Sequence, residues 1–149
     1  MWPFKRTKWE KLGNPWTGSA VSDRLRALSP RPAIILPPRD MDYRSIPHKD
    51  FEALLFDCWF PKDYMGYRPE IWDCDNWTLS CMARVSERWA KVSKGKEALA
   101  FGYIDADIEG MGYHEFVWHM DEIGHVAYYE PQWGRKVDYK LTGIGLMGT

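Results

Sequence analysis

A change of hydrophobic period near residue 95 constrains the fold more than any other feature of this sequence. From Cys74 to about Val92, large apolar side chains recur every four residues and charged side chains occupy the opposite face. This spacing predicts one long amphipathic helix. After Gly95 the pattern alternates, which predicts strands at 98–104, 113–120, 125–130 and 137–147, the last at an edge of the sheet. Helices followed by an antiparallel sheet predict an α+β domain.

A tight turn at 121–124 is predicted to join two of these strands into a hairpin. A hairpin centred near residue 122 pairs positions whose numbers sum to roughly 244, and 114 and 130 meet that condition. We therefore expect His114 and Glu130 to be near neighbours, on the face against which the long helix packs. His119 and His125 also sum to 244 but fall on the opposite strand faces. Because no soft ligand lies near them, we favour surface or core roles over a metal pair.

The N-terminal third differs in composition from the rest of the chain. Prolines interrupt residues 1–47 repeatedly and predict an irregular, basic arm, with a short helix at 22–28 and an extended run at 33–36. Residues 48–149 are expected to form one compact domain, beginning with a helix at 49–58 whose first turn follows the cap-region residue His48. The arm has the charge to bind nucleic acid. We consider this unlikely because the body is net acidic and carries no recognition motif.

Composition excludes several classes of protein. The 149 residues carry a net charge of −1 and three cysteines without a CxxC pair, which argues against a disulfide framework. The first residues contain no apolar signal-peptide core, and no window has the ~18 apolar residues that a membrane span requires. We therefore expect a cytoplasmic protein that contacts no membrane and keeps its thiols reduced.

The tetrapeptide Asp73-Cys74-Asp75-Asn76 opens the long helix and is the strongest candidate site. A cysteine in the first turn of a helix faces unpaired N–H groups and the positive end of the dipole, which favours the thiolate. The flanking carboxylates oppose that ionisation unless a cation binds them. The alternative interpretation is structural: Asp73 is an N-cap and Cys74 a small core residue.

A thiol, a histidine and an acceptor in this order suggest a nucleophilic triad. His114 would take the proton of Cys74, and Glu130 would fix the tautomer and orientation of the imidazole. The separations are 40 residues from Cys74 to His114 and 16 from His114 to Glu130.

These residues resemble the papain-like and transglutaminase-like cysteine peptidases. Asp73-Cys74-Asp75-Asn76 is similar to the Asp-Cys-Glu-Asp of bacterial transglutaminase-like periplasmic peptidases. Tyr-Tyr-Glu-Pro-Gln at 128–132 resembles the peptidase domain of the fairy-ring mushroom agglutinin and its phage-encoded relatives. The resemblance implies a papain-like fold and a cysteine peptidase or amidohydrolase with catalytic Cys74, His114 and Glu130.

The resemblance further implies calcium at Asp73 and Asp75, no organic cofactor, and a peptide or protein substrate in a groove beside Trp72 and Gln132. A homodimer is also considered. Two departures favour a rival reading, an inactive papain-like scaffold that serves as a phage-encoded binding or virion-associated protein, located in the host cytoplasm or the virion. The oxyanion-hole glutamine of papain-like enzymes is replaced by Arg68, and Asn76 replaces an acidic residue.

Overall fold

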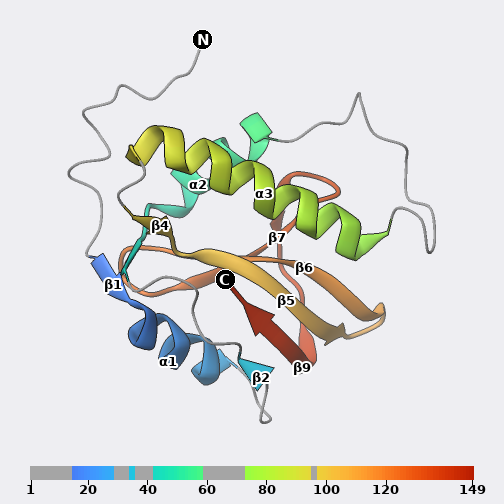
Figure 1. Ribbon diagram of the computed structural model, residues 1–149. Helices are drawn as coiled ribbons and strands as arrows, with labels where there is room; N and C mark the ends of the chain where they lie inside the picture. Colours follow the sequence, from blue (N-terminus) through green and yellow to red (C-terminus); the bar gives the residue numbers. More distant parts are fainter. Residues whose placement is uncertain (1–14, 29–33, 36–41, 59–72, 95–96) are drawn as a thin grey trace.

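The computed structural model describes residues 15–28, 34–35, 42–58, 73–94 and 97–149. These ranges form a mixed α/β structure in which helices cover both faces of the main sheet (Figure 1). The helices are α1 (Gly18–Leu28), α2 (His48–Cys58) and α3 (Cys74–Ser93). The predicted α+β class is therefore confirmed at this level, and so are the predicted helices at 22–28, 49–58 and 74–92, the first of which begins earlier, at Gly18.

The strands of the described residues form two sheets. The six-stranded sheet has the order β2-β9-β5-β6-β7-β8, and the smaller sheet has the order β1-β3-β4. The bounds are β1 (Pro15–Thr17), β2 (Ile34–Ile35), β3 (Asp42–Arg44), β4 (Ala98–Leu99), β5 (Phe101–Ile108), β6 (Gly112–Met120), β7 (Val126–Glu130), β8 (Arg135–Val137) and β9 (Leu141–Gly148).

The β6–β7 hairpin has a register close to the predicted one. Val117 pairs with Tyr129 and Met120 with Val126, so paired numbers sum to 246 rather than 244. Asp121 fixes the turn, because its Oδ1 accepts the backbone N–H groups of Ile123 at 3.1 Å and His125 at 2.8 Å. The alternative in which His119 and His125 face each other is not formed, since His119 lies opposite Ala127.

The C-terminal strand departs from its predicted place at an edge. β9 lies between β2, which pairs with it in parallel, and β5, which pairs with it antiparallel. β5 and β9 approach so closely that a Cβ atom on Gly102 would stand 1.9 Å from the Gly148 carbonyl oxygen. Glycine therefore permits a contact that places β9 inside the sheet, and alternation alone did not reveal it.

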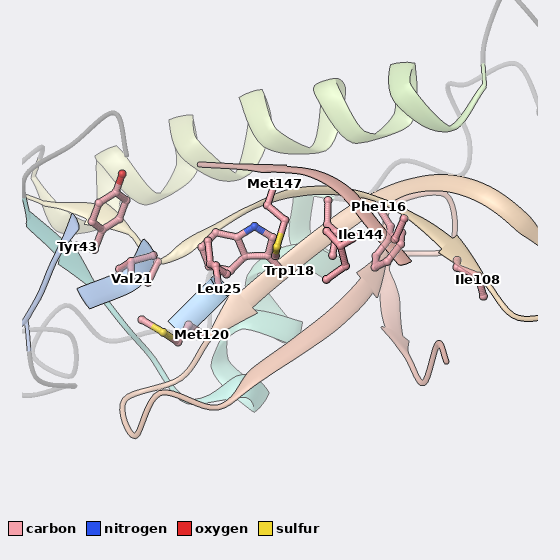
Figure 2. Packing of buried hydrophobic residues seen from close by; sticks show 12 residues of the cluster. Val21, Leu25, Tyr43, Ile108, Phe116, Trp118, Met120, Ile144 and Met147 are labelled. Atoms are coloured by element: carbon pink, nitrogen blue, oxygen red, sulfur yellow. The ribbon is translucent and has the colours of Figure 1, made fainter. Parts of the chain in front are cut away.

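Apolar side chains fill both sides of the six-stranded sheet. One cluster joins α2 and α3 to the sheet through residues that include Phe51, Val85 and Tyr129. The other, drawn in Figure 2, joins α1 to the opposite face and centres on Trp118. Each fully buried large side chain contributes about 1.5–3 kcal/mol to folding. Because Val21 and Leu25 are buried there, residues 15–28 of the predicted arm pack into the same core.

Both ends of α3 follow the sequence signals. Asp73 is the N-cap residue, and its backbone N–H donates to Asn76 Oδ1 at 3.3 Å. Lys94 adopts the left-handed conformation with φ 57°, and its N–H donates to the Ala90 carbonyl oxygen. The structural role weighed for Asp73 is therefore present. No helix in the described part of the chain is long and apolar enough to cross a membrane.

Candidate functional site

A buried hydrogen-bonded network surrounds Glu130 at the end of β7. His114 Nε2 donates to Glu130 Oε2 at 2.6 Å, and the Tyr139 hydroxyl donates to the same oxygen at 2.8 Å. The backbone N–H of Gln132 donates to Glu130 Oε1 at 3.2 Å. The predicted proximity of His114 and Glu130 is therefore confirmed. Glu130 is almost fully buried, so these donors supply the partners that an interior carboxylate needs.

Aromatic rings enclose this network. His114 stacks on Phe116 with ring centroids 5.9 Å apart and meets the edge of Tyr139 at 6.0 Å. Burial and the Glu130 carboxylate raise the pKa of Tyr139, so its hydroxyl stays a donor. Sequence reasoning missed Tyr139. The sequence showed only that a tyrosine follows the hairpin. The contact of Tyr139 with Glu130 spans β8 and leaves no pattern among neighbouring residues.

Cys74 is the first residue of α3, as predicted, but its surroundings favour the thiol. Burial raises the pKa of Cys74, and the carboxylates of Asp73, Asp75 and Glu115 act in the same direction. A backbone hydrogen bond from Glu115 opposes them and is outweighed. The helix dipole therefore does not produce the predicted thiolate.

The predicted meeting of Cys74 and His114 rested on the helix packing against the face that carries His114. α3 instead contributes Val85 and Trp89 to the cluster that contains Val117. His114 packs with Phe116, which belongs to the cluster on the other side of the sheet. Within the described residues no hydrogen bond joins Cys74 to His114; the hydrogen-bonding neighbour of the thiol is the backbone of Glu115. The structure therefore brings together His114 and Glu130 without showing an activated thiol.

Carboxylates crowd together beside the start of α3. A hydrogen bond to the Asp73 carboxylate, which only protonated Asp75 can donate, raises the pKa of Asp75. Burial raises the pKa of Glu115 to about 8, with further contributions from a hydrogen bond to Asp105 and from the charges of Asp105, Asp75 and Asp73. These shifts mean that the group shares protons rather than carrying its full negative charge.

The same carboxylates test the predicted calcium site. Their oxygen atoms are the donors that Ca²⁺ prefers. In the described ranges, however, no three His, Cys, Asp or Glu side chains are arranged to hold a metal ion. Asp73 and Asp75 therefore do not form a complete coordination set as they stand, and no step of function is derived through a metal.

The two predicted groove residues have different outcomes. Trp72 lies outside the described residues. Gln132 lies in the turn between β7 and β8, next to Trp133, whose side chain is 43% exposed. A cavity of about 300 Å³ lies elsewhere, lined by residues of α3, β4 and β5 that include Trp89 and Phe101, and Cys74, His114 and Glu130 do not line it.

Comparisons with known proteins found likeness in structure alone. No family model and no curated protein matches this sequence. A structure described as the PSL1a–E64 complex superposes with a TM-score of 0.70 at 21% identity, covering 91% of this chain and 50% of that chain. Polyporus squamosus lectin bound to the human-type influenza-binding epitope Neu5Acα2-6Galβ1-4GlcNAc superposes with a TM-score of 0.67 at 20% identity, covering 91% and 49%. This chain therefore shares a fold with about half the length of each of these two chains.

These comparisons correct the identification drawn from the sequence. One of these two solved structures is described as a lectin bound to a glycan epitope, and the description of neither names a peptidase. Assignment to the papain-like and transglutaminase-like cysteine peptidases is therefore wrong, and so are the hydrolase function, the catalytic triad and the peptide substrate. The rival reading, an inactive peptidase scaffold encoded by a phage, loses the resemblance on which it rested.

Proposed function

We propose that this chain is a carbohydrate-binding domain. The observation that carries the proposal is the TM-score of 0.67 with a lectin bound to Neu5Acα2-6Galβ1-4GlcNAc, over 91% of this chain. In more detail, we propose that this chain has the fold of these structural neighbours rather than a papain-like fold. Because the chain matches only half the length of each of these chains, the proposal that this half binds glycans rests on the chemistry of its own surface.

The turn between β7 and β8 offers an aromatic platform. Trp133 is 43% exposed at this turn, although most large apolar side chains of the sheet are buried. An exposed indole presents an apolar face and a polar N–H, a combination that suits a sugar ring with its C–H face and hydroxyl groups. We therefore place Trp133 at the centre of the proposed glycan site.

Buried hydrogen bonds hold this platform in place. The Glu130 carbonyl oxygen accepts the backbone N–H groups of Trp133 at 3.2 Å and Gly134 at 2.8 Å. Gly134 has φ 63°, a conformation that favours glycine. The Glu130 side chain ties the same turn to His114 and Tyr139. In this proposal His114 and Glu130 are positioning residues, because a binding group that is ordered beforehand loses less entropy on binding.

Arg135 adds a charge suited to acidic sugars. Its guanidinium carbon lies 5.2 Å from the centroid of the Trp133 ring, in a cation–π arrangement. A guanidinium binds carboxylates through paired N–H groups. Arg135 would therefore favour a glycan that ends in a sialic acid over the same glycan without it.

Calorimetric titration of the chain with Neu5Acα2-6Galβ1-4GlcNAc and with Galβ1-4GlcNAc tests the proposal. We expect both to bind and the sialylated glycan to bind more tightly. Arg135→Gln should remove the difference, whereas Arg26→Gln on α1, also an exposed arginine, should keep it. Absence of saturable binding by either glycan would refute the proposed function.

Three earlier expectations stay predictions. Calcium at the carboxylates beside α3 is one, and the division into a basic arm and a body at residues 47 and 48 is another. A cytoplasmic location is the third. None of them is needed for the glycan site, which uses the β7–β8 turn.

A further inference from the structure

The cavity of about 300 Å³ lies where the smaller sheet passes into the larger one, beneath the C-terminal part of α3. Its lining comes from α3, from β3 and β4 of the smaller sheet, and from Phe101 at the start of β5. The end of α3 lies over β4 at this point (Figure 1). No described residue of the β7–β8 turn lines the cavity, so it is separate from the proposed glycan site.

Aromatic rings form the floor of this cavity. Tyr43, Trp89 and Phe101 line it, and each of them is at most 4% exposed. The polar atoms of two of these rings are already engaged. Trp89 Nε1–H donates to the Glu97 carbonyl oxygen at 2.8 Å, and the Tyr43 hydroxyl lies 3.0 Å from Thr149 Oγ1. The floor therefore presents mainly ring carbon atoms to a bound molecule.

More exposed residues form the rim. Ser86 and Ala90 of α3 line the cavity and are exposed, whereas Met82 and Ala98 line it and are half-buried. A cavity with a buried floor and an exposed rim opens to solvent on one side. A small molecule can therefore enter it without unfolding any element, as in most preformed ligand sites.

The charge beside the cavity is compensated. Glu97 carries the one charged side chain among the described lining residues. Arg44 binds both of its carboxylate oxygens, with Nε 2.6 Å from Oε2 and Nη2 2.7 Å from Oε1. Such a bidentate pair leaves no net charge for an ionic ligand. Charge complementarity therefore selects an uncharged molecule.

The volume limits the size of the ligand. An apolar cavity of about 150 Å³ accommodates a single benzene ring, and pockets for drug-sized molecules begin at about 300 Å³. With about 300 Å³, this cavity is suited to two fused rings. An aromatic ligand also gains stacking or edge contacts with the rings of the floor, which a saturated molecule of the same size does not make.

We propose that this cavity binds a small, flat, uncharged aromatic molecule of about two fused rings, held between α3 and the junction of the two sheets. The walls are ordered before binding. Tyr43 pairs with Ala98 in the parallel β3–β4 ladder, and the Ala100 N–H donates to the Arg44 carbonyl oxygen at 2.9 Å. Binding therefore loses little conformational entropy of the protein. This site is additional to glycan binding and does not depend on it.

Titration of the intact chain with 2-naphthol at pH 7, followed in nitrogen-15–proton correlation spectra, tests the proposal. This probe is flat, has two fused rings and is uncharged at that pH. We expect saturable shifts of the Trp89 indole N–H and of the Leu99 and Phe101 amides. Decahydro-2-naphthol, its saturated counterpart, should bind at least about threefold more weakly. Absence of saturable shifts at these residues would overturn the proposal, and equal affinities for the two probes would refute the aromatic class of ligand.

Ala90→Phe tests the location of the site. Ala90 lines the cavity from an exposed position of α3, so a phenyl ring there should occupy space that the probe needs and leave the buried floor intact. Ala83→Phe is the matched control, because Ala83 is also exposed on α3 and does not line the cavity. The affinity for 2-naphthol should fall at least about tenfold in Ala90→Phe and stay unchanged in Ala83→Phe. Equal affinities of the two variants would overturn the proposed site, whatever the result of the glycan titration.

Discussion

His114 and His119 lie on the same strand, β6, on opposite faces, and each is hydrogen-bonded to a side chain from another element. The partner of His114 is the carboxylate of Glu130, at 2.6 Å, and that of His119 is the imidazole of His48, at 3.0 Å. The first hydrogen bond survives protonation of the ring, since Nε2–H donates in both forms. The second needs one of the two rings to stay neutral, because an imidazolium only donates and the other ring must accept.

The difference teaches that the partner, rather than the histidine, decides what such a site can do. In the His114 network both carboxylate oxygens of Glu130 accept hydrogen bonds, and one of them ties Glu130 to the turn that carries the exposed Trp133. The His119 pair leaves one buried nitrogen without a partner among the described residues. One strand thus carries a histidine bound to a carboxylate on one face and a histidine paired with a second imidazole on the other.

The largest expected effect comes from removing Glu130. Glu130→Ala should destabilise the protein by about 3–5 kcal/mol, because it strands buried donors from His114 and Tyr139. Urea unfolding at pH 7.5 measures this. Glu109→Ala is the control, since its pair with Lys140 is exposed at 57% and 74% of the side chains and should contribute within about 0.5 kcal/mol. Equal losses in both variants would mean that the network does not stabilise the fold.

A smaller effect on stability is expected for His119→Phe, which should be less stable than the wild type at pH 7.5 but not at pH 5. The phenyl ring keeps the stacking on Phe51 but loses one hydrogen bond, about 1 kcal/mol at pH 7.5. At pH 5 it should be at least as stable as the wild type, since it has no second proton to exclude. Thermal unfolding at the two pH values gives the comparison, and a constant difference between the proteins would argue against a proton-dependent pair.

The carboxylates beside α3 give a third, weaker test. The pKa of Glu115 is raised to about 8. Its contribution to the stability of the fold is therefore lost as the pH rises from the usual pKa of glutamate to about 8 and beyond. Glu115→Gln should therefore stabilise the protein at pH 8.5 by about 1 kcal/mol, a value reduced because solvent screens this half-exposed group.

Calcium should act in the same direction if it replaces the shared protons. It should raise the melting temperature of the wild type at pH 8.5, and a chelator should reverse this. Asp75→Asn should respond less to the ion. A melting temperature insensitive to calcium would remove the metal prediction and leave the proton-sharing account intact.

The smallest effect is expected at Cys74. Since its pKa is raised, alkylation of Cys74 should be slow at pH 7 and accelerate only in the alkaline range. His114→Ala should leave the rate unchanged, because the imidazole contacts Glu130 and not the thiol. Fast alkylation near neutral pH that depends on His114 would contradict the correction of the peptidase assignment.

The sequence predicted the local elements well because their signals are local. The four-residue spacing around Val85, the capping residue Asp73 and the alternation of β6 each act within a few residues. The hairpin also predicted the contact of His114 with Glu130, because a tight turn limits the register. The predicted sum of paired positions, 244, differs by two from the observed 246, and His114 still contacts Glu130.

Long-range packing was not predictable in the same way. Both faces of β6 are buried, with Val117 in the cluster under α3 and Phe116 and Trp118 in the cluster on the other side. Alternation therefore could not tell which face α3 covers, and Cys74 was assigned to the wrong one. The pairing of His48 with His119, 71 positions apart, has no sequence signal. Function was assigned from three motif residues, whereas the comparisons concern the fold of the whole chain.

The measurement that tests the proposed function most directly is the affinity of Trp133→Ala for Neu5Acα2-6Galβ1-4GlcNAc, beside the wild type and Trp16→Ala. Trp16 is a partly buried residue of β1 that packs against the cluster joining α1 to the sheet, and it is distant in sequence from the β7–β8 turn. We predict saturable binding by wild type and Trp16→Ala, and a loss of at least about tenfold, or 1.4 kcal/mol, in Trp133→Ala. Equal affinities of all three proteins would contradict the proposed site, and no binding by any of them would contradict the proposed function.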